Sequence, residues 1–200
     1  MRWILGGIAL VLALVAPAYA MTWQGVDLDP QGEIRPQLLE SALTSYQHHQ
    51  GEHLSSRTMM IVDYSKPSSQ RRMYLLDLHS GTVRSYLVAH GQGSDRNHDG
   101  IADFFSDADG SHASSIGAFR AAARYQGGHG LSLALDGLDP TNHSARARAV
   151  VLHSQWYVSQ QMIAQHGVLG RSWGCFVVEP SVIAQVVAAL EGGGFIYADR

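Results

Sequence analysis

The chain has 200 residues and is poor in cysteine and lysine, and each shortage excludes a class of protein. Its single cysteine, Cys175, rules out an intramolecular disulfide and any zinc or iron–sulfur site built from several cysteines. Lys66 is the one lysine among 14 basic residues, and the arginines are scattered. Because no basic run is present to neutralise phosphates, we expect no nucleic acid partner. Three uses are left for the thiol: packing, an intermolecular bond or chemistry.

Long hydrophobic runs are also missing, apart from one at the N-terminus. Arg2 precedes an apolar segment at 3–15, and residues 18–20 (Ala-Tyr-Ala) form a small-x-small cleavage site. The apolar segment is short for a membrane span and no second one follows, which favours a cleaved signal peptide at 1–20 over a membrane anchor. We therefore expect a periplasmic or otherwise exported protein that leaves the membrane after cleavage. An idle thiol is a liability in an oxidising compartment.

The remaining composition is globular, with 46% hydrophobic and 16% charged residues, and its patterning predicts a mainly β fold with a few short helices. Within the lead-in at 21–56, residues 22–35 are expected to be irregular, and Pro36 then begins an amphipathic helix that runs to about Gln50. Three strands follow as a β-meander, at 58–64, 72–78 and 82–89. After a polar loop at 90–115, strands are expected at 119–125, 131–135, 149–153, 176–178 and 195–197, with helices at 157–165 and 181–190.

A glycine-rich loop leads into the strand that follows Cys175. In the segment 170–178, Gly174 lets the backbone turn sharply and lets a substrate come close. We expect the backbone N–H groups of Trp173, Gly174 and Cys175 to be free to bind an oxyanion. A thiol in this position is a candidate nucleophile, and the alternative is a buried, inert cysteine.

A nucleophilic thiol needs a base, and His153 is the candidate. It lies at the end of the apolar strand, where a rigid backbone can hold an imidazole beside a thiol. Ser154 follows directly and is expected to orient the ring through its side chain or its carbonyl. The imidazole would take the thiol proton during the reaction or hold it in a preformed ion pair.

The spacing of these residues resembles a known signature. His153-Ser154, followed after a spacer by Ser172-Trp173-Gly174-Cys175, is similar to the catalytic motif of YkuD-type L,D-transpeptidases. Residues 90–94 and 114–119 are also similar to segments of the murein L,D-transpeptidase catalytic domain family. The resemblance covers about residues 57–200. It implies a β-rich, L,D-transpeptidase-like fold, either a β-sandwich or a meander, with a catalytic domain at 57–200.

The resemblance also implies a reaction. Family members are exported cysteine acyltransferases that act on peptidoglycan tetrapeptide stems, and here the thioester would form on Cys175. A second stem would resolve it, giving a cross-link between two third-position residues. The resemblance implies no metal or organic cofactor, and it implies reaction with carbapenem inhibitors. The alternative is an L,D-carboxypeptidase or endopeptidase that uses the same site with water as acceptor.

The chain departs from the family motif at three positions, the first of which is Ser154, where the motif has Gly after the histidine. Trp173 replaces a second histidine, which favours His153 as the base. Val177 stands where many members have Arg or Asn, so Arg171 is the nearest candidate to bind a stem-peptide carboxylate. The alternative for that arginine is a solvated loop charge. Ser172 and His129 complete the expected substrate-binding set.

A second polar pattern lies at 95–103. Its Asp and Asn oxygens and Gly100 match the first half of a calcium loop, but Ser106 stands at the position of the final glutamate. A polar Asx-turn loop is favoured, and a noncatalytic calcium-binding exported domain is the alternative of another class. The scattered histidines match no local zinc-peptidase signature. His90, His112 and His143 lie in predicted loops, and most of the histidines are expected to be surface or loop residues.

Overall fold

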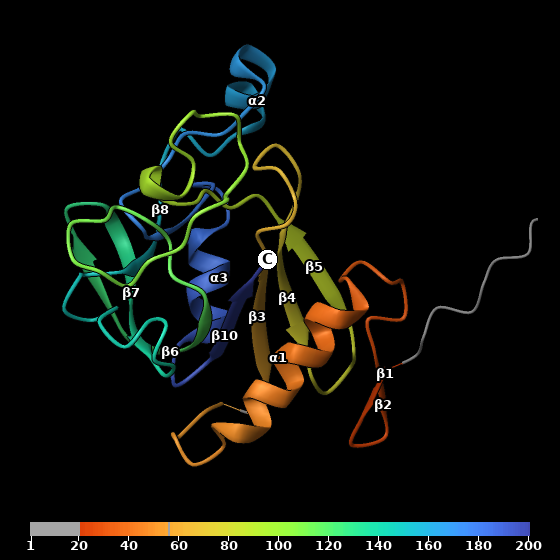
Figure 1. Ribbon diagram of the computed structural model, residues 1–200. Coiled ribbons are helices and arrows are strands. Elements are labelled where there is room, and N and C mark those ends of the chain that lie inside the picture. Colours follow the sequence, from red (N-terminus) through yellow and green to blue (C-terminus); the bar gives the residue numbers. More distant parts are fainter. Residues whose placement is uncertain (1–20, 56) are drawn as a thin grey trace, which may run out of the picture.

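The computed structural model describes residues 21–55 and 57–200, so the predicted signal peptide lies outside the described residues. Within these ranges no helix is long and apolar enough to cross a membrane. The chain path is shown in Figure 1. The elements are β1 Met21–Trp23, β2 Val26–Leu28, α1 Pro36–His48, β3 Thr58–Asp63, β4 Met73–Asp77, β5 Val83–Tyr86, the 3-10 turn η1 Gln92–Ser94, β6 Gly117–Gly127, β7 Gly130–Gly137, β8 Val151–Ser154, α2 Gln160–His166, β9 Phe176–Val178, α3 Ile183–Leu190 and β10 Phe195–Asp199.

Eight of the strands form one mixed sheet in the order β5-β4-β3-β10-β6-β7-β8-β9. The predicted meander is the antiparallel run of β3, β4 and β5. Two pairs are parallel, β10 with β3 and β8 with β9. The predicted mainly β class is confirmed. The second parallel pair contains His153 and begins directly after Cys175, so it connects the two residues singled out from the sequence.

The sheet is curled around its core. Phe119 of β6 and Phe176 of β9 meet edge to face with ring centroids 5.3 Å apart, although β7 and β8 separate their strands in the sheet order. Ala89, just after β5, bridges to Val177 of β9, so the two ends of the strand order approach each other. All eight strands, or residues directly beside them, contribute buried side chains to one cluster with α3. This closure brings the loop after β5 against the segment that bears Cys175.

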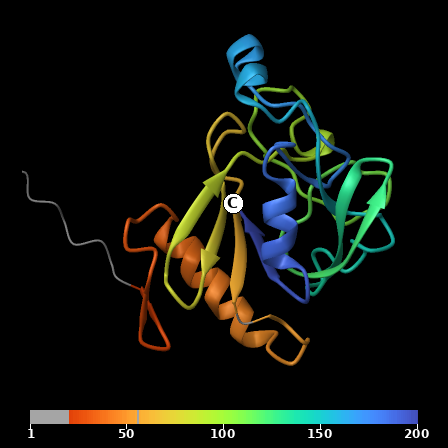
Figure 2. The same cartoon turned by 180° about the vertical axis from the view of Figure 1, so that it is seen from behind.

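The two longer helices cover opposite faces of the sheet. In Figure 1, α1 lies in front of β3 and β4, and in the reverse view of Figure 2 it lies behind them. Met59 and Ile61 of β3 pack with α1, whereas Met60 and Val62 of the same strand pack with α3. Strand alternation requires this division, since successive side chains point to opposite faces. Pro36 is the first helical residue of α1, where its missing N–H has no intrahelical role.

Three local predictions were wrong. The lead-in expected to be irregular contains the β1–β2 hairpin, with Met21 paired to Leu28. The helix expected at 157–165 begins at Gln160, three residues late, and the last helix begins at Ile183 with Val182 at its N-cap, two residues late. Three-residue strands carry too little alternation to be recognised from side chains alone. Helix ends depend on backbone geometry that a single favourable capping residue does not determine.

Candidate active site

The sheet register places His153 and Cys175 on one face. Leu152 pairs with Phe176 across β8 and β9, and both side chains are buried in the main core. The next pair, His153 and Val177, therefore points to the other face. Cys175 lies two residues before Val177, and the two belong to the same smaller apolar cluster. The parallel pairing thus carries the imidazole and the thiol to the same side of the sheet.

The His153 ring is oriented by its neighbour. Its side chain is buried, and Nδ1 lies 3.2 Å from the backbone carbonyl oxygen of Ser154. Because a carbonyl can only accept, Nδ1 carries the proton and Nε2 holds the free lone pair. The serine therefore acts through its main chain. This is the tautomer that a general base requires at Nε2.

A second histidine stacks on His153. The rings of His129 and His153 have centroids 4.3 Å apart and planes inclined by 21°. Gln155 holds the His129 ring in place by donating from Nε2 to His129 Nδ1 over 3.0 Å. Burial lowers the pKa of His153 to about 4, against the opposing bond from Ser154, and His129 lowers it further. The imidazole is therefore neutral at physiological pH.

Cys175 rests as a neutral thiol. Its Sγ donates to the carbonyl oxygen of Ala149 over 3.7 Å. Burial raises the pKa of Cys175, while the Val151 backbone N–H and the Arg148 charge oppose that rise. A thiol with a raised pKa and an imidazole with a lowered pKa, both lining one cleft, each stay neutral at rest. The preformed ion pair considered from the sequence is therefore not the resting state.

The loop that bears the thiol is folded around one hydroxyl. Ser172 Oγ donates to the Cys175 carbonyl over 2.8 Å and accepts from the Gly174 N–H over 3.1 Å. The expectation that the Gly174 N–H is free for an oxyanion is corrected by this bond. Gly174 has φ +107°, and a Cβ there would lie 2.6 Å from the Ala113 carbonyl oxygen. Only glycine fits this position, because both the backbone conformation and the space exclude a side chain.

A cleft of about 510 Å³ gathers six of the residues singled out from the sequence. They are His129, His153, Arg171, Ser172, Trp173 and Cys175. Ser154 supports the cleft through its carbonyl bond to the imidazole. Trp173 is 70% exposed and stacks on His112 at 4.5 Å, so it stands at the rim of the cleft. Arg171 donates from Nη1 to the Asp95 carbonyl oxygen, which fixes one end of its guanidinium.

The polar loop at 95–103 is closed on itself. Asp95 is fully buried, and its carboxylate accepts from the N–H groups of Asp99 and Gly100, each at 3.0 Å. Its Oδ2 also lies 3.0 Å from Nε2 of His90. Among residues 21–55 and 57–200, no group of three or more His, Cys, Asp or Glu side chains is arranged to hold a metal ion. His90 lies in a loop, as predicted, but its side chain is buried in this network, which the sequence did not indicate.

The family follows from the sequence as a whole. A sequence model of the L,D-transpeptidase catalytic domain family matches residues 30–198. The chain belongs to this family. The match begins before Pro36 and so includes α1. The chain has no match among curated proteins.

Several solved L,D-transpeptidases are distantly similar. One from Mycobacterium smegmatis is 12% identical with a TM-score of 0.43, over 72% of this chain and 59% of that one. One from Stackebrandtia nassauensis is 12% identical with a TM-score of 0.45, over 82% and 67%. L,D-transpeptidase 3 from Mycobacterium tuberculosis, in complex with a faropenem-derived adduct, is 8% identical with a TM-score of 0.45, over 72% and 60%. The chain thus spans about 59% of the length of the first of these.

One residue of this L,D-transpeptidase domain was missed from the sequence. Arg148 lines the cleft and clamps the loop at 106–115 beneath Gly174. Its side chain is 4% exposed and lies 3.6 Å from Asp107. Its donors reach Ser106 O, Ser111 Oγ, Ala113 O and Ser115 Oγ. The partners lie more than thirty residues upstream, so no local pattern around Arg148 indicates them. Gln155 and Tyr157 also line the cleft, and their only sequence signal was proximity to His153.

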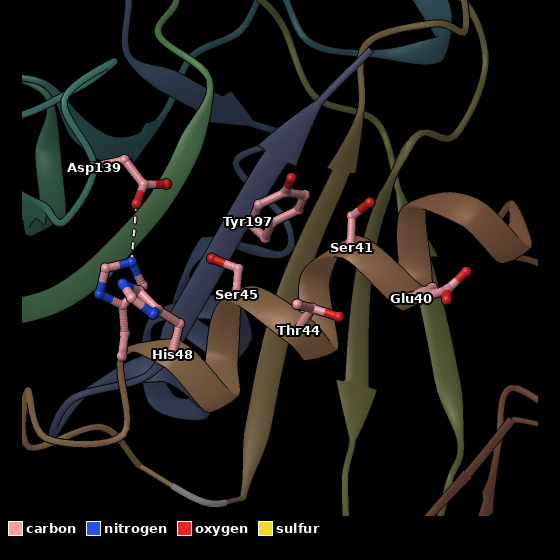
Figure 3. Close-up of a pocket in the computed structure, with 8 residues that line it drawn as sticks. Glu40, Ser41, Thr44, Ser45, His48, Asp139 and Tyr197 are labelled. Carbon is pink, nitrogen blue, oxygen red and sulfur yellow. Dashed lines mark hydrogen bonds and ion pairs between the residues drawn. The ribbon is translucent and has the colours of Figure 1, made fainter.

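A second cavity of the L,D-transpeptidase domain lies between α1 and β10 (Figure 3). It has a volume of about 540 Å³, and hydroxyl groups of α1 face Tyr197 across it. His49 Nε2 lies 2.9 Å from Asp139, and this pair ties the end of α1 to the turn after β7. The lining holds no thiol, since the only cysteine lies in the other cleft. The Cys175 cleft is therefore the candidate active site.

Proposed function

We propose that the protein is an exported cysteine L,D-transpeptidase that acts on peptidoglycan tetrapeptide stems. One observation carries the proposal: in a chain of this family, the single thiol and a correctly tautomerised imidazole line one cleft. The thioester would form on Cys175, and the product would be a cross-link between third-position residues. The Arg2 and apolar pattern at 1–20 supports export.

The first step makes the carbon–sulfur bond. The thiol turns from the Ala149 carbonyl toward His153 Nε2 and attacks the carbonyl carbon of the third stem residue. Because the pKa of Cys175 is raised and that of His153 is lowered to about 4, proton transfer accompanies attack and does not precede it. The carbonyl electrons move to oxygen. With the Gly174 N–H held by Ser172, we assign oxyanion stabilisation to the backbone N–H groups of Trp173 and Cys175.

The second step releases D-alanine. The imidazolium form of His153 is a strong acid in this buried setting, so it protonates the leaving amine readily. The carbon–nitrogen bond breaks and the thioester remains on Cys175. The side-chain amine of a second stem then attacks the thioester and gives its proton to His153. The carbon–sulfur bond breaks, and the thiolate recovers that proton.

The rim of the cleft supplies the groups that would hold the stem. Arg171 presents a guanidinium anchored at one end by the Asp95 carbonyl, and this suits a terminal carboxylate. The stacked His112 and Trp173 offer a flat surface beside the thiol. His129 covers the base and limits the rotation of its ring. This domain uses no metal in the proposed steps.

Product analysis tests the function. The protein without residues 1–20 is incubated with disaccharide-tetrapeptides, and the products are separated and weighed by mass spectrometry. Dimers that have lost one D-alanine support transpeptidation. Tripeptide monomers alone would replace it with the hydrolytic alternative, in which water is the acceptor. Equal products from wild type and Cys175→Ala would end the enzyme assignment, and calcium-dependent melting would then favour the binding-domain alternative.

A further inference from the structure

A buried chain of three polar side chains lies behind the active-site loop. Arg72, His90 and Asp95 are each at most 1% exposed. Arg72 Nη2 lies 2.7 Å from His90 Nδ1, and His90 Nε2 lies 3.0 Å from Asp95 Oδ2. None of the three lines the Cys175 cleft. We call these residues the relay.

The chemistry of the partners fixes the proton positions in the relay. An arginine can only donate, so His90 Nδ1 accepts and Nε2 carries the proton that is donated to Asp95. The imidazole is therefore a neutral bridge between a buried cation and a buried anion. Arg72 also donates hydrogen bonds to the backbone carbonyl oxygens of Lys66 and Val88. His90 is thus the side chain that joins the two charges, and its loss leaves each without that partner.

The segment at 90–95, which contains His90 and Asp95 of the relay, holds the active-site loop through its backbone. The His90 carbonyl accepts from the Ser172 N–H over 2.9 Å, and the Gln92 N–H donates to the Ser172 carbonyl over 2.7 Å. The Asp95 carbonyl accepts from Arg171. Ser172 in turn holds the carbonyl of Cys175. Both Ser172 and Arg171 are therefore attached to the segment that the relay braces.

We propose that His90 is a positioning residue: by bridging Arg72 to Asp95 it fixes the backbone that places Ser172, Arg171 and so the Cys175 thiol. In its catalytic consequence this inference rests on the proposed function. The side chain does not line the cleft, and its ring nitrogens bond to Arg72 and Asp95, so we infer that it acts through the segment at 90–95. A loop free to shift by about 1 Å would lose much of its acylation rate.

Two substitutions of His90 separate the effect of its hydrogen bonds from the effect of the space that its side chain fills. His90→Gln keeps an acceptor and a donor on one planar group, so it can still bridge Arg72 to Asp95. His90→Leu fills the space but removes both bonds. Hydrogen exchange is followed by mass spectrometry on a peptide covering 170–176, with a peptide covering α1 as the internal control. The second-order rate of carbapenem acylation is measured on the same samples.

The inference predicts a local effect that the conservative variant rescues. In His90→Leu, exchange at 170–176 should rise and acylation should fall, each by about 10-fold or more, with α1 unchanged. His90→Gln should stay within about 3-fold of wild type in both. Unchanged exchange at 170–176 in folded His90→Leu, or a Gln variant as impaired as Leu, would overturn it.

Two further outcomes are decided in advance. If His90→Leu does not fold, Asp95→Asn takes its place, because it keeps the backbone carbonyl that holds Arg171 but weakens the bond to His90. Unchanged exchange at 170–176 in Asp95→Asn would count against the inference. If wild type is not acylated, the proposed function fails, and the exchange data still decide whether the relay holds the loop.

Discussion

The buried imidazole of His153 should make the folded protein sensitive to acid, and His153→Gln should remove part of that sensitivity. Burial holds the pKa of His153 at about 4, below its ordinary value of 6.5. Between these two values the unfolded chain binds the proton and the folded chain does not. The stability contributed by the neutral ring is therefore complete above pH 6.5 and is lost as pH falls through 6.5 toward 4.

The magnitude follows from the size of that displacement. Each unit between folded and unfolded pKa values corresponds to about 1.4 kcal/mol, so the contribution of His153 to stability should fall by roughly 2–3 kcal/mol between pH 7.5 and 4.5. The residue is only 3% exposed, which agrees with burial as the main cause of the lowered pKa. His90, whose pKa burial also lowers to about 4, adds its own loss to the wild type. The difference between wild type and His153→Gln isolates the active-site ring.

Urea unfolding at pH 7.5 and pH 4.5 measures the effect. The fall in unfolding free energy should be smaller in His153→Gln than in wild type by about 2–3 kcal/mol. His166→Gln is the matched control, because His166 is exposed at the end of α2 and its replacement should leave the fall unchanged. An equal fall in wild type and His153→Gln would refute the claim that the ring is held neutral by burial.

Other variants test the loop and the base. Gly174→Ala should lose about 1–3 kcal/mol of stability and at least about 100-fold in kcat/KM, because the φ of +107° and the Ala113 carbonyl leave no room for a Cβ. Thermal melts and D-alanine release assays measure the two losses. Gly51→Ala is the control, because a Cβ there meets no atom within 4 Å. Ser172→Ala should lower stability by about 1–3 kcal/mol, since it removes the bonds to the Gly174 N–H and the Cys175 carbonyl. In steady-state kinetics it should lower kcat by a larger factor than it changes KM, and an unchanged kcat would contradict this. His129→Leu should raise the pKa of His153, because it removes a neighbour that lowers it, and NMR titration of the ring should detect an upward shift.

The sequence was most informative where chemistry and local pattern coincide. Pro36 and the apolar spacing after it predicted α1 well, and apolar runs rich in Met, Ile and Val, separated by turn residues, predicted the meander. The glycine-rich loop and the strand end made Cys175 and His153 candidates, and the resemblance of their sequence spacing to the family motif then favoured them as the catalytic pair. The register of β8 and β9 explains why this spacing along the sequence suits a shared site, since it puts both residues on one face of the sheet.

Other features depend on contacts between distant segments. Arg148 meets the loop at 106–115, and His90 meets Arg72 across eighteen positions, so neither role has a local signature. The Gly174 N–H was expected to be free because nothing in the sequence reveals that Ser172 folds back on it. The burial of His90 was not predicted, because loop composition does not show which loop residues the curled sheet buries.

The most direct test of the proposed chemistry is the mass of the protein after exposure to a carbapenem. The carbonyl of the β-lactam ring should acylate the thiol, so wild type should gain the mass of one whole inhibitor on the peptide that contains Cys175. Cys175→Ala should gain nothing, and His153→Ala should react far more slowly. An unmodified wild type, or an adduct of the same mass on Cys175→Ala, would contradict the assignment of Cys175 as the nucleophile.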